Sequence, residues 1–362
     1  MTLRRILLKT HLYLALAAAP VFVVLGLTGS VIAFEADIPH WLHPDLFYVR
    51  PGPAARPEQE LVRDVEQRFA PLRVQSVQIL RGANLARVVQ LQGGLSVYVN
   101  PYDGTILGTA RGGFASDRIV QYIHQTHLRL APDPRAMPRL AAAGKVVVSY
   151  AGLVLCLLVP TGLILFWRTR RATVRWRASW FSACFDLHHV VGVFGSVFLW
   201  LAAITGVLIG FPSGEKIIYG VTSSESPRPL PTPRSSPGDG RAPLTIDQAL
   251  AVARTAFPDG VATGYSLPRQ PTAVFTVLVR VPGETSEAVH SSVAVDQYSG
   301  AILQTRDFRT ESAGYYWIRF NRSLHTGDVW GAPTHVVAAI VSLLLVVMVL
   351  TGVVIWWRKL AV

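Results

Sequence analysis

The sequence predicts a membrane protein: a four-transmembrane-helix bundle, formed by an internal duplication, that carries two small α+β domains on its outer side. Three observations support this prediction. The 362-residue chain is 51% hydrophobic and only 15% charged, whereas soluble domains carry about 25% charged residues. It contains four apolar segments that are long enough to cross a bilayer. It also repeats itself, because nearly the same eight residues, TGLILFWR and TGVVIWWR, end two of these segments.

The four apolar segments are the predicted transmembrane helices, since a span needs about 20 apolar residues. None has a charge at its centre, and they cover residues 12–34, 144–167, 190–211 and 336–357. The first is too long for the apolar part of a typical signal peptide and resembles the third, so we expect no cleavage. The sequence divides into seven predicted regions. They are the N-terminus with the first span (1–34), the first outer domain (35–142), the second span (143–167), an arginine-rich loop (168–187), the third span (188–211), the second outer domain with its linker (212–334) and the fourth span with the tail (335–362).

Basic residues indicate the orientation of these spans. They gather in the N-terminal segment, in the loop WRTRRATVRWR and beyond the fourth span, and all three must lie on one side of the membrane. The positive-inside rule makes that side cytoplasmic. We therefore expect a multi-pass protein of the bacterial inner membrane, with both termini cytoplasmic and both outer domains in the periplasm. The net charge of +12 is largely explained in this way, so lipid and not nucleic acid is the expected partner.

A Thr-Gly pair recurs in every predicted span. The first and third spans continue as TGSVIAF and TGVLIGF, whereas the second and fourth end as TGLILFWR and TGVVIWWR. The first span therefore corresponds to the third, and the second to the fourth. This pattern predicts that the chain arose by duplication of a two-span unit.

The outer segments repeat as well. VYVNPYDGTILGT in the first corresponds to VAVDQYSGAILQT in the second, and alternating apolar residues around a Tyr-x-Gly turn predict a β-hairpin in each. A helical pattern precedes both hairpins, as EQELVRDVEQRFA and TIDQALAVARTAF. The Pro/Ser-rich run SSESPRPLPTPRSSPGDG connects the third span to the second outer domain, and its composition predicts a flexible linker.

The motifs DLHHVVG, SLHTG and TGVVIWWR, together with the four Thr-Gly spans and the two outer domains, resemble the PepSY-associated transmembrane proteins along nearly the whole chain. Within that family the chain is most similar to di-haem inner-membrane reductases of ferrioxamine-type ferric siderophores. The resemblance implies PepSY-like outer domains, two haem b groups, and an oxidoreductase that reduces siderophore-bound Fe(III) to release Fe(II). The cysteines agree with a non-covalent haem, because the sequence has no CxxCH motif.

Two histidines stand at matched positions near the cytoplasmic end of the bundle. His11 lies 17 residues before Thr28, and His188 lies 17 residues before Thr205. Two imidazoles that face each other across a bundle can hold one iron from both sides. We therefore expect His11 and His188 to ligate an inner haem, with His189 as a reserve ligand. A single interfacial histidine that bonds lipid or backbone is the alternative, and the matched spacing favours the ligand.

The outer side offers a second pair of histidines. IHQTHLRL and NRSLHTGD both precede an even-numbered span, and aligning them places His127 opposite His325. These two residues are the expected ligands of an outer haem. His124 is a reserve ligand, and His335 remains an alternative to His325, although Lys145 occupies the position that corresponds to His335.

Other residues near the two levels are candidate haem contacts. A glycine in each span would let a flat macrocycle approach the backbone, although small residues also serve close helix packing. Two arginines, each seven residues after a threonine of the repeat, would pair with haem propionates, or would serve only the positive-inside rule. These candidates are Gly29, Gly162, Gly206, Gly352, Arg168 and Arg358.

The expected function is transmembrane electron transfer from the cytoplasmic side to a periplasmic ferric siderophore. The sequence has no GxGxxG motif, so the electron donor must be a separate quinol or a cytoplasmic reductase. The rival interpretation is a haem-free membrane sensor, scaffold or protease-regulating protein, because PepSY-like domains occur in such proteins. That rival gives no reason for matched histidines at both faces of the membrane.

Overall fold

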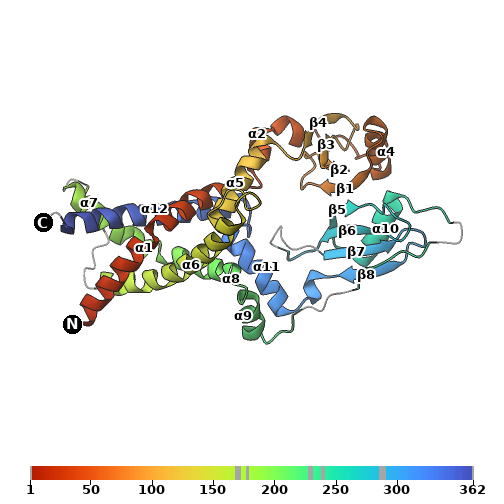
Figure 1. Cartoon of the computed structure of the whole chain (residues 1–362). Coiled ribbons are helices and arrows are strands. Elements are labelled where there is room, and N and C mark those ends of the chain that lie inside the picture. The colour runs from red at the N-terminus through yellow and green to blue at the C-terminus, as the bar shows by residue number, and fades with distance from the viewer. Residues whose placement is uncertain are drawn as a thin grey trace. The chain divides into compact units, whose positions relative to one another are not determined.

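The computed structural model describes residues 2–167, 173–176, 179–226, 231–237, 241–284 and 291–360, without the side chains of 359 and 360. The chain forms two compact units (Figure 1). The helical one is called the membrane unit, and the one built on a β-sheet is called the sheet unit. The membrane unit comprises Met1–Glu35, Ile119–Glu225 and Ala313–Val362, and the sheet unit comprises Ala36–Arg118 and Ser226–Ser312.

Long apolar helices form the membrane unit. α1 (Leu3–Ile32), α6 (Pro138–Phe166) and α12 (Ala332–Leu360) are each long and apolar enough to cross a membrane, and α7 (Trp180–Phe194) with α8 (Ser196–Gly210) forms a further candidate span. α1 packs against both α6 and α12, while α8 packs against α6 and α7 against α12. The chain is therefore a multi-pass membrane protein with three spans, or four if the α7–α8 pair counts as one.

The third span is bent, whereas the sequence predicted one continuous helix over 190–211. α7 and α8 meet at Gly195 with an angle of 63°. A Cβ at Gly195 would lie 2.7 Å from the carbonyl oxygen of Val191, so only glycine fits there without a shift. The neighbouring Ser196 hydroxyl donates to the carbonyl of Val193. Gly/Ser pairs are a recognised cause of sharp helix kinks.

Side chains in the membrane unit separate into a small interior and a large apolar exterior. The interior includes Phe22, which is 2% exposed, together with leucines from α6, α8 and α12. On the outside, Leu27, Tyr150 and Ile340 are each at least half exposed. Soluble monomers rarely expose apolar surface on this scale, so hydrocarbon is the expected surroundings of these faces.

Three short helices belong to the membrane unit, although the sequence analysis placed them in the outer domains 35–142 and 212–334. They are most of α5 (Ala115–Arg129), α9 (Gly214–Val221) and α11 (Ala313–Thr326). α9 and α11 pack together, and both contact α8. The separation between the two units therefore lies nearer the sheet than the hydropathy profile indicates, because polar helices can still pack on the ends of apolar ones.

The sheet unit holds one antiparallel sheet of eight strands, where the sequence predicted two separate small domains. The strand order is β4-β3-β2-β1-β5-β6-β7-β8, so the edge strand of one repeat pairs with the edge strand of the other. The strands are β1 (Val74–Ile79), β2 (Arg87–Leu91), β3 (Leu95–Val99), β4 (Ile106–Arg111), β5 (Val261–Ser266), β6 (Val274–Arg280), β7 (Ser291–Asp296) and β8 (Ile302–Arg306), and the short 3₁₀ helix η1 (Phe308–Thr310) follows.

Two helices complete the core of this sheet. α4 (Glu58–Arg68) and α10 (Ile246–Ala256) share one continuous apolar cluster with residues from both halves of the sheet. Val89 belongs to this cluster, whereas its neighbour Val88 packs with Phe47 and Tyr98 in a second cluster. Adjacent strand residues point to opposite faces, so the second cluster covers the other face beside α2 (Ile38–Leu42) and α3 (Pro44–Phe47).

Reciprocal helix caps join the two halves of the sheet unit. The carboxylate of Asp247 in α10 accepts hydrogen bonds from the backbone N–H groups of Glu58 and Gln59, which begin α4. In return, the Gln59 side chain accepts from the backbone N–H of Ile246, the first residue of α10. Each helix thus satisfies N–H groups of the other that have no partner within their own helix. The single sheet follows from these caps and from the β1–β5 pairing.

The two predicted β-hairpins are confirmed, with the same turn chemistry in each. β3 pairs with β4 and β7 with β8, both antiparallel. The side chains of Asn100 and Asp296 accept backbone N–H bonds two residues further on. Gly104 and Gly300 then adopt φ angles of +80° and +73°, which side chains disfavour. The repeated Tyr-x-Gly signal therefore reports a real backbone requirement.

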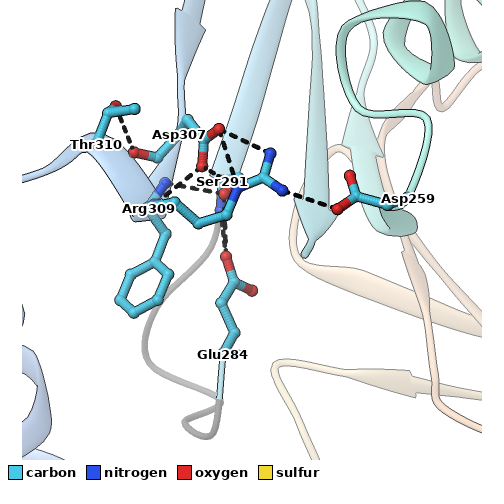
Figure 2. Close-up of polar contacts among 7 residues, drawn as sticks. Asp259, Glu284, Ser291, Asp307, Arg309 and Thr310 are labelled. Atoms are coloured by element: carbon cyan, nitrogen blue, oxygen red, sulfur yellow. Dashed lines mark hydrogen bonds and ion pairs between the residues drawn. The ribbon is translucent and has the colours of Figure 1, made fainter. Parts of the chain in front are cut away.

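A polar cluster fixes one end of the second hairpin (Figure 2). Glu284 accepts hydrogen bonds through one carboxylate oxygen from the backbone N–H and the hydroxyl of Ser291, where β7 begins. Arg309 donates to Asp307 and to Asp259. The Arg309 hydrogen bonds hold the pKa of Asp307 below its ordinary value. These contacts occur in the second half only and fasten η1 to the strands beside it.

Candidate functional site

Four histidines share one contact in the membrane unit. In each case the ring nitrogen Nδ1 lies 2.9 Å from the hydroxyl oxygen of a threonine, and that threonine begins one of the four Thr-Gly pairs. The pairs are His11–Thr161, His127–Thr28, His188–Thr351 and His325–Thr205. The structure thus brings together the two repeated features of the sequence, at the four histidines predicted as ligands.

The inner pair lies where α1 meets α6 and where α7 meets α12. His11 projects from α1 onto α6, and His188 projects from α7 onto α12. Because α7 begins at Trp180 and not at 188, His188 lies in the middle of a helix.

The outer pair comes from the short helices α5 and α11. His127 projects from α5 onto α1, and His325 projects from α11 onto α8. Their ring centroids are 6.4 Å apart, with an angle of 59° between the ring planes. The structure therefore brings the two histidines of the predicted outer pair close together, with their rings tilted relative to each other.

The glycine of each Thr-Gly pair provides space for a histidine ring. A Cβ at Gly29, Gly162, Gly206 or Gly352 would lie 3.1–3.3 Å from the Cε1 atom of the histidine bound to the adjacent threonine. From the sequence, these glycines were expected to let a flat macrocycle approach the backbone or to serve close helix packing, and in the structure each lies beside a histidine ring. Glycine is needed because a methyl group would push the ring away from the threonine hydroxyl.

Burial keeps the outer histidines neutral. Desolvation, with smaller contributions from His325 and His124, lowers the pKa of His127 to about 3. Burial also lowers the pKa of His325. Neutral imidazole is the form that binds metal ions. Since Nδ1 of each ring faces a threonine, the remaining ring nitrogen, Nε2, is the atom available to a metal.

These residues fit a haem better than a free metal ion. A ring nitrogen lies about 1 Å from the ring centroid and a metal–imidazole bond is about 2 Å long, so two imidazoles on opposite sides of one ion have centroids about 6 Å apart. The outer pair shows 6.4 Å. Within the part of the chain that the structure describes, no group of three or more His, Cys, Asp or Glu side chains is arranged to hold a metal ion. Two protein ligands suffice where a porphyrin supplies the other four.

The three reserve histidines make different contacts. The Nδ1–H group of His189 donates to the backbone carbonyl of Phe185 at 2.7 Å, and the His189 ring packs against the Phe185 ring. His124 pairs with the carboxylate of Glu35 at 2.6 Å. His335 uses its Nε2 atom, at 2.8 Å from the carboxylate of Asp328. These three contacts are to a carbonyl and two carboxylates and not to a threonine, which separates the reserve histidines from the four main candidates.

Of the two arginines predicted to contact haem propionates, only Arg358 lies within the described residues. Arg358 lies with its guanidinium carbon 4.5 Å from the centre of the Phe181 ring, a cation–π contact between α12 and α7. Arg168 lies outside the described residues. The sequence analysis missed Asp186, which is fully buried two residues before His188 and binds Arg175 through two side-chain hydrogen bonds. This pair fastens the described part of the arginine-rich loop to α7.

The threonine hydroxyls were also missed as functional groups. Their signal was visible in the sequence, because threonine precedes glycine in all four spans. The histidine contacts, however, join residues 99–163 positions apart in the chain. A local pattern does not say which distant side chain a hydroxyl meets, so only the folded structure assigns this role.

Comparison with known families gives one match. The model of the PepSY-associated TM region matches residues 8–359, nearly the whole chain. No curated protein matches the chain.

Proposed function

Since the chain belongs to the PepSY-associated TM family, we propose that it is a di-haem b-type electron-transfer protein of the bacterial inner membrane. His11 and His188 hold the inner haem, and His127 and His325 hold the outer one. Electrons pass from the cytoplasmic side to an acceptor in the periplasm. The matched arrangement also supports an origin by duplication, with four spans and PepSY-like halves in the sheet unit.

One observation carries the proposal. Four half-buried histidines, in two pairs, present the same ring atom to the same kind of residue at the same distance. Histidines retained for packing alone have no reason to share one geometry at both ends of a helical bundle. A common ligand that needs two axial imidazoles at each level explains the fourfold agreement.

The chain's own residues hold and shield such a group. The imidazoles supply two axial nitrogens at each level, the glycines admit the rings, and apolar side chains such as Phe22 exclude water between the levels. A haem with two histidine ligands supplies one-electron chemistry without an open position for oxygen. An interior-negative membrane favours outward electron movement by about 2.3 kcal/mol per 100 mV.

We propose a ferric siderophore of the hydroxamate type as the acceptor. The support is the resemblance of the histidine and Thr-Gly motifs to those of ferrioxamine-type siderophore reductases. Reduction of Fe(III) to Fe(II) by one electron weakens its binding to hydroxamate oxygens and releases the metal. Quinol or a cytoplasmic reductase supplies the electron. The enzyme class that follows is a ferric-siderophore reductase.

The test uses the purified full-length protein. We expect dithionite to produce reduced b-type haem bands and a ferric trihydroxamate siderophore to return them to the oxidised spectrum, with Fe(II) trapped by a chelator. The gallium complex of the same siderophore is the matched control, because Ga(III) cannot accept an electron. Haem that stays reduced with the ferric complex would exclude this acceptor. A colourless protein that takes up no haem would favour the membrane sensor or scaffold.

A further inference from the structure

The four threonines that face the histidines each make a second hydrogen bond. Their hydroxyl groups lie 2.6–2.8 Å from the backbone carbonyl oxygen four residues earlier in the same helix. A carbonyl oxygen only accepts hydrogen bonds, so the threonine must donate its hydroxyl hydrogen there. The bonds run from Thr28 to Val24, Thr161 to Leu157, Thr205 to Leu201 and Thr351 to Val347.

This second bond determines where the histidine hydrogen lies. A threonine hydroxyl has one hydrogen and two lone pairs. Once the hydrogen is donated along the helix, only lone pairs face the imidazole, so Nδ1 of the histidine must be the donor. The same hydroxyl also lies 3.0–3.4 Å from the backbone carbonyl oxygen three residues before each threonine, a second acceptor for its one hydrogen. That second acceptor points to the same assignment.

We propose that Thr28, Thr161, Thr205 and Thr351 are tautomer-setting residues: each holds its histidine with hydrogen on Nδ1 and leaves the Nε2 lone pair for iron. The role belongs to the threonine and glycine together, because glycine admits the ring to the hydroxyl. The Thr-Gly pair in every span is thus a docking unit for one histidine.

The remaining described contacts of histidines supply a contrast. His335 places Nε2 against the carboxylate of Asp328, and His124 places Nδ1 against the carboxylate of Glu35. Carboxylate partners are negatively charged and strongly raise the basicity of a ligating imidazole. The four candidate ligands have neutral hydroxyl partners instead. This choice fixes the tautomer while adding no net charge beside the metal.

An electronic consequence follows, and it rests on the proposed function. A hydrogen-bond acceptor at Nδ1 makes Nε2 a better electron donor and so favours Fe(III) over Fe(II). Removing one threonine acceptor therefore raises the reduction potential of the haem on its own level. If the preference for Fe(III) falls tenfold, the shift is about 59 mV for a one-electron couple.

The first experiment requires no haem. Full-length metal-free protein with ¹⁵N-labelled histidine is examined by NMR, and His325 is assigned from the spectrum of H325A. We expect the Nδ1–H tautomer in the wild type and in T205S, and a mixture of tautomers in T205V. Thr222 donates in the same way to the carbonyl of Ile218, and no described histidine bonds its hydroxyl, so T222V is the control and should match the wild type. An Nε2–H tautomer in the wild type, or no change in T205V, would overturn the proposal.

The second experiment measures midpoint potentials of the haem-loaded protein. T205V should raise the outer potential by about 59 mV and leave the inner one unchanged, and T205S should restore the wild-type value. Equal shifts at both levels, or no shift at either, would contradict the electronic role. Failure to bind haem would overturn the proposed function alone, because the NMR result decides the threonine assignment without it.

Discussion

The membrane unit and the sheet unit both carry the internal repeat, but the membrane unit repeats side-chain contacts whereas the sheet unit repeats backbone structure. In the membrane unit, four histidines contact four threonines at the same 2.9 Å. In the sheet unit the backbone repeats, with matching hairpins and turns, while many side-chain contacts occur once. Arg269 of the second half bonds Glu66 of the first, and Arg309 bonds Asp259 within the second half.

This difference between the units distinguishes side chains that serve a bound ligand from side chains that serve only the fold. A hairpin needs an Asx turn and a left-handed glycine, and Asn100 and Asp296 satisfy that need equally well. Ion pairs on such a scaffold are exchangeable and contribute little individually. Identical side-chain geometry at four positions is a stricter requirement, and one shared cofactor chemistry accounts for it.

Replacement of a single histidine in the membrane unit should have the largest effect. H188A should lose the inner haem and keep the outer one, and H325A should do the reverse, because each level depends on its own pair. The haem-to-protein ratio and the spectrum of each variant measure this. Loss of neither haem in H188A would show that the inner pairing is wrong.

A methyl group on one docking glycine should have a smaller effect at one level only. In G206A the added Cβ would lie 3.1 Å from Cε1 of His325, so the ring must shift by a few tenths of an ångström. We expect haem affinity at the outer level to fall about tenfold. G220A is the matched control, since a Cβ there meets nothing within 4 Å. Equal retention of haem in both variants would refute the steric role.

A buried charge in the sheet unit should affect stability without affecting haem. Glu58 is 8% exposed, pairs with Arg87 at 2.8 Å and accepts from the Tyr265 hydroxyl at 2.9 Å. E58A leaves Arg87 and the Tyr265 hydroxyl without this partner, and we expect a loss of about 3 kcal/mol in the free energy of unfolding. Protease resistance of the sheet unit reports the change. A simultaneous loss of haem would contradict the expectation that the sheet unit can be destabilised without affecting haem binding in the membrane unit.

The reserve histidines should show the smallest effect. H335A and H124A remove residues that bond the carboxylates of Asp328 and Glu35, so both variants should retain two haems. Haem spectra recorded beside those of H325A and H127A make the comparison. A missing outer haem in H335A would mean that His335, and not His325, is the ligand.

Local patterns in the sequence predicted much of this structure. The apolar runs, the helices α4 and α10 and both hairpins follow from periodicity and turn residues within short windows. The inner histidine candidates followed from equal spacing to the repeated threonines, and the outer ones from aligning IHQTHLRL with NRSLHTGD. Each of these features is indicated by a pattern within a sequence window of about 20 residues.

The unpredicted features depend on distant contacts. The single sheet arises where Val77 of β1 meets Tyr265 of β5, and no local pattern reveals that pairing. The bend at Gly195 requires knowledge of the Val191 carbonyl beside it and of the neighbouring helix. The linker was expected to be flexible, yet Ser235 is buried and bonds Thr272, which composition cannot show.

Quantification of haem in the purified full-length protein tests the central claim most directly. Two imidazole pairs predict two haem b groups per chain, each with the low-spin spectrum of two histidine ligands. The account is contradicted if the protein binds no haem when haem is supplied, or if it binds only one per chain.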